Sequence, residues 1–167
     1  YYNMNCLKKW GCEVNKTLIV ESKSDKSFIE ALVNHLNSNN INIEQSICSI
    51  DDYQCLNGLD LNKLINALKA FLNSLAKKEE SIESLGIILD NDGRRDERIN
   101  WINEAIKEAF KSDQRITEIG QPIDISFVDA GEDNYNFRLS CFLIGVNNEG
   151  ELETLIKAIK ATPSPYA

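Results

Sequence analysis

Several features that mark common protein classes are missing from this sequence of 167 residues. It has one histidine, and its five cysteines form no C-x-x-C pair, which excludes the ligand spacing of zinc fingers and ribbons. No apolar run approaches the roughly 20 residues of a membrane-spanning helix. No apolar segment typical of a signal peptide opens the chain. We therefore expect a cytoplasmic protein that does not enter a membrane and whose cysteine thiols are reduced.

The single histidine also limits the catalytic mechanisms that are available. A Ser-His-Asp or Cys-His catalyst would depend on His35, which lies between Val33 and Leu36 on a segment with helical apolar spacing. Such a position is typical of a packing or surface residue, so we expect His35 to have no catalytic role.

Positive charge is scarce as well. The chain has 18 Lys and Arg against 26 Asp and Glu, a formal net charge of −8. This balance argues against a protein that coats nucleic acid with its whole surface. It leaves open an acidic site that recruits divalent cations, which then meet phosphate.

What the sequence does contain is a regular alternation of strand-like and amphipathic helical segments. The order βαβαβαββα predicts an α/β fold, a single Rossmann-like domain whose central, mostly parallel sheet is flanked by helices. We expect this domain over 15–161, an N-terminal extension at 1–14 and a tail at 162–167. Ser24 or Asp25 is expected to cap the first helix. The expected strands lie at 16–20, within 41–48, and at 85–89, 123–128 and 137–146. The expected helices lie at 28–36, 61–75, 99–110 and 152–159.

Acidic residues follow two of the strongest strands. Glu21 comes after the first strand, and Asp90 and Asp92 come after the third. Ligands of open parallel sheets bind at the carboxyl ends of the strands, so these acids should meet at one edge. Their mutual repulsion would be relieved by a divalent cation, and hard oxygen ligands suit Mg²⁺ or Mn²⁺. The alternative is that the acids serve helix N-termini, with Asp25 as the cap of the first helix and Asp92 beside the third.

Two general motifs compete for Asp90-Asn-Asp-Gly93. An EF-hand loop requires Gly at its sixth position, where Arg95 stands, so this motif is excluded. Phosphatases with an aspartyl nucleophile open with Asp-x-Asp-Gly on their first strand, whereas Arg94 follows the motif here and the strand is mid-chain. Phosphatase chemistry is therefore the last-ranked alternative.

Three segments together resemble known proteins. Segment 18–30 carries Glu21 at a strand end, segment 85–92 ends in Asp-x-Asp, and segment 147–153 contains Gly-x-Leu-Glu. This arrangement resembles the Toprim fold, the catalytic domain shared by topoisomerases, bacterial primases, some nucleases and recombination proteins. The last segment looks like the C-terminal pattern of a small stand-alone family of the DUF3226 type, related to the Toprim half of overcoming-lysogenization-defect nucleases. The resemblance spans residues 16–160.

The resemblance implies a phosphodiester-processing enzyme that depends on Mg²⁺ or Mn²⁺, most simply a small nuclease acting on DNA or RNA. It implies Glu21 as general base or metal ligand, and Asp90 and Asp92 as metal ligands. Asp25 and Glu153 would be supporting acids. No catalytic Tyr can be assigned, so strand passage of the topoisomerase type is not expected.

Basic residues near these acids are candidates for phosphate contact, namely Lys23, Lys26 and Arg94. The alternative is that they are solvated residues at helix starts, paired with neighbouring acids. A second function also stays open: a non-catalytic regulatory module that keeps the scaffold and binds a metal or a protein partner. The net charge and the lack of an extended basic run favour this second function.

Overall fold

The computed structural model describes residues 15–38, 40–48, 58–78, 81–128, 134–145 and 152–159. The expected extension at 1–14 and tail at 162–167 lie outside these ranges. The described elements follow the predicted order: β1 (Asn15–Val20), α1 (Lys23–His35), β2 (Ile41–Ile43), α2 (Leu61–Lys78), β3 (Ile82–Asp90), α3 (Arg95–Phe110), β4 (Ile123–Val128), β5 (Asn134–Ile144) and α4 (Leu152–Ile159).

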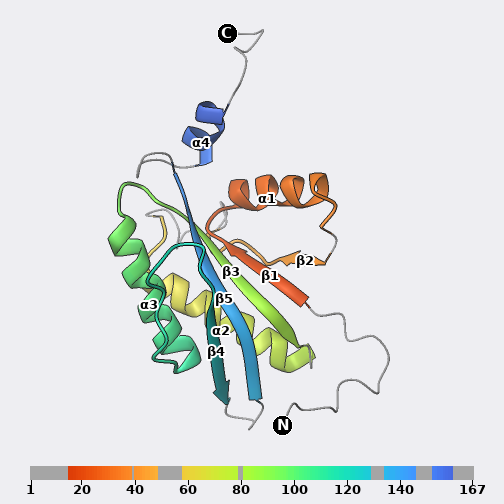
Figure 1. Ribbon diagram of the computed structural model, residues 1–167, viewed down its shortest axis with the longest axis vertical. Coiled ribbons are helices and arrows are strands. Elements are labelled where there is room, and N and C mark those ends of the chain that lie inside the picture. The colour runs from red at the N-terminus through yellow and green to blue at the C-terminus, as the bar shows by residue number, and fades with distance from the viewer. Residues whose placement is uncertain are drawn as a thin grey trace.

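The five strands form one sheet in the order β2-β1-β3-β5-β4. β1 pairs with β2 and β3 in parallel, β3 pairs with β5 in parallel, and β4 is antiparallel to β5. The prediction of a mostly parallel α/β sheet flanked by helices is therefore confirmed. Because β1 and β3 are parallel neighbours, the residues that follow them emerge at the same edge of the sheet (Figure 1).

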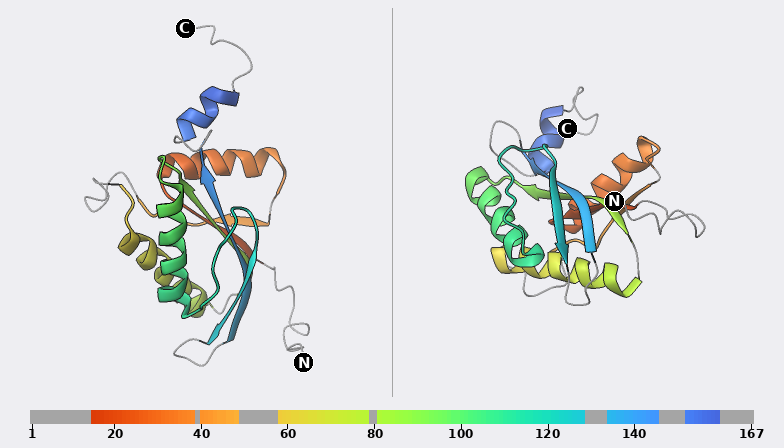
Figure 2. Two further views of the ribbon diagram at one scale, coloured as in Figure 1. Left: turned by 60° about the vertical axis from the view of Figure 1, so that its left-hand side comes forward. Right: turned by 60° about the horizontal axis from the view of Figure 1, so that its bottom comes forward.

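Helices cover both faces of the sheet (Figure 2). Alternate residues of a strand point to opposite faces, and β3 shows this directly: Ile87 belongs to the core beneath α2 and α3, and Ile88 to the cluster beneath α1 and α4. Leu68 of α2 and Ile106 of α3 are fully buried in the first core. This two-sided burial explains why β3 reads as a nearly continuous apolar run.

The start of α1 differs from the expectation. Its N-cap is Ser22, not Ser24 or Asp25. The Ser22 hydroxyl accepts a hydrogen bond from the Asp25 N–H over 3.2 Å, and the Asp25 carboxylate accepts one from the Ser22 N–H over 2.9 Å. This reciprocal capping box places Asp25 at the third helical position, so the helix starts closer to β1 than predicted.

The cysteines also correct an expectation. Cys48 is disulfide-bonded, so the prediction of reduced thiols throughout is wrong at this position. Cys141 is a free thiol in the core, and burial raises its pKa to about 11 against a small opposing effect of Arg95. Among the described helices, none combines the length and the apolar character needed to cross a membrane.

Candidate functional site at the carboxyl edge of the sheet

Glu21 is held at the end of β1 by both its backbone and its side chain. Its carbonyl accepts a hydrogen bond of 2.8 Å from the Cys48 N–H. Its side chain is buried, and Oε2 accepts a hydrogen bond of 3.1 Å from the N–H of Asp90, the last residue of β3. The structure thus brings Glu21 and Asp90 together at one sheet edge, as the parallel strand pattern predicted.

A tight turn after β3 positions Asp92. The Asn91 N–H donates to the carbonyl of Ile144 on β5, and the Arg94 N–H donates back to the carbonyl of Asn91. Asp92 and Gly93 both adopt left-handed backbone conformations, with φ of 50° and 68°. Aspartate tolerates this conformation better than most residues, and glycine adopts it without steric cost. The turn therefore leaves the Asp92 side chain within reach of α3.

Arg98 of α3 connects these acids. Its side chain is 1% exposed, and its Nη2 lies 2.6 Å from Asp92 Oδ2 and 3.6 Å from Glu21 Oε1. Its guanidinium also lies over the Trp101 ring, 4.8 Å from the ring centroid. One buried cation thus contacts two carboxylates from different strand ends. We call Glu21, Asp90 and Asp92 the carboxylate edge.

Residue order did not place Arg98 between Glu21 and Asp92. A charged residue near a helix start is usually solvated, and acidic neighbours within α3 offered it partners. One signal was present nevertheless. Arg98 lies one turn before Ile102 and two turns before Ala105, so it is on the apolar stripe that α3 turns toward the sheet.

Burial and neighbouring charges act in opposite directions on the pKa of Glu21. Burial raises its pKa above the ordinary value of 4.5, and the charges of Asp92 and Asp25 raise it further. Arg98 and the Asp90 N–H lower the pKa, but burial prevails. Glu21 is therefore a stronger proton acceptor than an exposed glutamate.

The predicted phosphate contacts lie at the starts of α1 and α3. Arg94 Nη2 lies 3.3 Å from Asp92 Oδ2, and its Nε lies 3.7 Å from Glu97. Lys26 lies 3.9 Å from Glu30, one turn further along α1, and Lys23 is the exposed first residue of that helix. Such exposed pairs contribute little stability, so these cations can exchange an acidic partner for a phosphate at small cost.

The two supporting acids are placed differently from the carboxylate edge. The Asp25 carboxylate is engaged in the capping box and also accepts a hydrogen bond of 2.6 Å from the Ser22 hydroxyl. The contacts of Asp25 are therefore those of a helix-capping residue, as the alternative interpretation expected. Its charge still raises the pKa of Glu21. Glu153 belongs to α4, and its side chain lies outside the described residues, so its role stays a prediction.

The donors of the carboxylate edge suit a divalent cation in chemical type. They are hard carboxylate oxygens, and the buried side-chain oxygen of Asn91 has no hydrogen-bond partner within the described ranges. Their arrangement is not a closed ligand set: in the part of the chain that is described, no three His, Cys, Asp or Glu side chains are grouped to hold one ion. Arg98 contacts Glu21 and Asp92 instead. The residues fit Mg²⁺ or Mn²⁺ in kind, with a protein cation among them.

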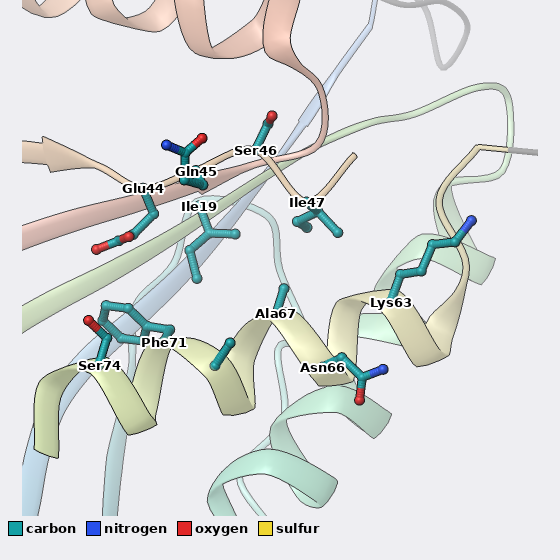
Figure 3. Close-up of a pocket in the computed structure, with 11 residues that line it drawn as sticks. Ile19, Glu44, Gln45, Ser46, Ile47, Lys63, Asn66, Ala67, Phe71 and Ser74 are labelled. Carbon is teal, nitrogen blue, oxygen red and sulfur yellow. The ribbon is translucent and has the colours of Figure 1, made fainter. Parts of the chain in front are cut away.

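A separate cavity of about 370 Å³ lies between segment 44–47 and α2. Figure 3 shows the side chains of this segment on one side and those of α2 on the other, with Ile19 of β1 between them. Ile19 and Phe71 give it an apolar lining, and Glu44 and Lys63 are polar residues beside them. None of the predicted site residues lines this cavity, so it is distinct from the carboxylate edge.

Fold and site together define an α/β protein with carboxylates at the ends of two adjacent parallel strands. The chain belongs to the DUF3226 family, described as a protein of unknown function, which matches residues 15–166. This confirms the family expected from the sequence. No curated protein and no solved structure matches the chain.

Proposed function

We propose that the carboxylate edge is a Toprim-like site and that the protein is a small Mg²⁺- or Mn²⁺-dependent nuclease acting on DNA or RNA. The observation that supports this proposal is the meeting of acids from two strands. Glu21 after β1 contacts Asp90 at the end of β3, and Arg98 joins Glu21 to Asp92. Acids gathered at the carboxyl edge of a parallel sheet are well placed to act on one ligand.

In this proposal each acid has a distinct task. Asp90 and Asp92 would hold the ion, which when bound supplies a Lewis acid for a phosphoryl oxygen. Glu21 would orient a water molecule and take its proton as the water oxygen bonds to phosphorus. The bond from phosphorus to the leaving oxygen breaks in the same step, and that oxygen takes a proton from solvent.

The basic residues around the edge would bind the nucleic acid backbone. Lys23, Lys26 and Arg94 are the candidates, and each is at a helix start close to the acids. The chain has a net charge of −8, and these three cations can neutralise only a few phosphates. Binding should therefore be weak and should decline steeply with salt.

The test is incubation of the purified chain with single- and double-stranded DNA and RNA, in Mg²⁺, Mn²⁺ or EDTA. We expect metal-dependent cleavage that Glu21→Gln abolishes. Glu83→Gln is the matched control, because Glu83 is a surface acid of β3 that pairs with Arg138. The nuclease proposal fails if all four substrates stay intact with Mn²⁺ at low salt, or if Glu21→Gln cuts as well as the unmodified protein.

One observation favours a second candidate, a non-catalytic module that binds a metal or a protein partner. Arg98 and Arg94 already balance the charges of Glu21 and Asp92, as in a structural ion-pair network. Binding of Mn²⁺ without cleavage of any nucleic acid would favour this module over the nuclease.

A further inference from the structure

We infer that Arg98 is the resident counter-ion of the carboxylate edge, and that a divalent cation held by Asp92 competes with Arg98 for that carboxylate. This inference rests on the proposed function, since it concerns how the same site takes up its metal. Arg98 would be a positioning residue that sets the availability of the two acids.

The ion pairs of Arg98 share one nitrogen atom. A single nitrogen of Arg98 contacts both acids, at 2.6 Å from Asp92 and 3.6 Å from Glu21. A metal ion held by Asp92 needs the negative charge of the carboxylate that this nitrogen contacts. Because Arg98 and Glu21 are buried, their charges attract each other more strongly than charges in water do. A metal ion at Asp92 and the Arg98 guanidinium therefore compete for the same negative charge.

The hydrogen bonding of Arg98 itself is incomplete within the described residues. Its Nε and Nη1 are buried and have no hydrogen-bond partner within the described residues. A guanidinium has five N–H donors, and these two nitrogens carry three of them. Unpaired buried donors are costly, so the acids and the Trp101 ring are what hold the cation in place. An ion that takes Asp92 also takes a counter-charge from this buried guanidinium, so the two cations compete.

The chain offers a matched control in Arg94. Both arginines contact the same oxygen, Asp92 Oδ2, but the Arg94 side chain is 48% exposed and that of Arg98 is 1% exposed. If Mn²⁺ binds only when Arg98 has released Asp92, its apparent affinity is lower because only a fraction of the molecules are in that state. Removing Arg98 should remove this penalty, and removing Arg94 should change it little.

The experiment is calorimetric titration of Mn²⁺ into the full chain and into Arg98→Gln and Arg94→Gln. We expect Arg98→Gln to bind Mn²⁺ about tenfold more tightly than the unmodified chain, and Arg94→Gln to stay within about twofold. Thermal melts add a second readout. Arg98→Gln should melt lower in EDTA, because two acids lose their counter-ion, and Mn²⁺ should restore more of its melting temperature than it adds to the unmodified chain.

The inference is overturned if Arg98→Gln binds Mn²⁺ no more tightly than the unmodified chain, or if Mn²⁺ does not restore its melting temperature. If this variant does not fold, the Arg98 Nε–H signal is followed by NMR in the unmodified chain during Mg²⁺ titration. A shift with the midpoint of binding supports competition, and an unchanged signal overturns it. Tight Mn²⁺ binding by Arg98→Gln without nuclease activity would contradict the nuclease alone, whereas no Mn²⁺ binding by any variant would contradict both.

Discussion

The carboxylate of Glu21 accepts a hydrogen bond of 3.1 Å from the backbone N–H of Asp90, 69 residues further along the chain. This contact joins the ends of β1 and β3, and it leaves the other Glu21 oxygen facing Arg98. Glu21 therefore has a structural role in addition to any chemical one, and the two roles can be measured separately.

Replacing Glu21 should lower stability by an amount that depends on the substitute. Glu21→Ala leaves the Asp90 N–H without its acceptor and takes one acid from the buried Arg98, so we expect a loss of about 2–3 kcal/mol. Glu21→Gln retains an acceptor oxygen of similar shape and removes a charge that burial disfavours, so it should lose less stability than Glu21→Ala. Urea denaturation at pH 7 measures both. Equal losses would show that the contact with Asp90 contributes nothing.

The raised pKa of Glu21 also predicts a pH dependence of stability. At pH values between 4.5, the ordinary pKa, and the raised pKa of the folded protein, Glu21 is protonated in a larger fraction of folded than of unfolded molecules. The free energy of unfolding contributed by this group therefore falls as pH rises through that window, and levels off above it. Denaturation curves from pH 4 upward should show this fall relative to Glu21→Gln, which lacks the titrating group. A difference that grows with pH would contradict the assignment.

The capping box of α1 predicts a local stability effect. Ser22→Ala removes the hydroxyl that accepts the Asp25 N–H, and should destabilise the protein by about 1 kcal/mol. Ser24→Ala is the control, because Ser24 is exposed within the first turn and was one of the two caps expected from the sequence. Thermal or urea denaturation should show almost no change for Ser24→Ala. A larger loss of stability for Ser24→Ala than for Ser22→Ala would place the cap at Ser24.

A second buried polar contact anchors the segment after α3. The Asn103 side chain donates to the Ile116 carbonyl over 3.1 Å and accepts from the Ile116 N–H over 2.7 Å, with both residues buried. Asn103→Ala leaves the N–H and carbonyl of Ile116 without this partner and should lower the free energy of unfolding by about 3 kcal/mol. Asn100→Ala, on the exposed side of the same helix, should cost less than about 0.5 kcal/mol. Similar losses in urea denaturation would contradict the anchoring role.

Cys141 should be chemically inert in the folded protein. Its pKa of about 11 keeps the thiol protonated at pH 8, and its side chain is buried. Since the thiolate is the nucleophile, iodoacetamide should modify Cys141 at pH 8 only after unfolding. Mass spectrometry of the modified peptides, with and without urea, measures this. Fast modification without urea would show that the thiol reaches solvent in the folded state.

Much of the fold follows from local sequence. The apolar periodicity predicted the order of the elements, and the strand at 123–128 was placed with its observed limits. The position of Glu21, Asp90 and Asp92 at strand ends also follows from residue order, because a parallel sheet brings successive carboxyl ends to one edge. The type and order of the elements depend on interactions between residues that are close in sequence, so they can be predicted from the sequence alone.

The pairing of side chains depends on tertiary structure. Residue order does not say that β3 lies between β1 and β5, since hydrogen bonds between distant segments set that order. It also does not place Arg98 between Glu21 and Asp92, because the same charge at a helix start is more often solvated. α3 packs its apolar stripe on the sheet, and this packing carries Arg98 out of water along with Ile102. A buried charge must then find opposite charge nearby, and the strand ends supply it.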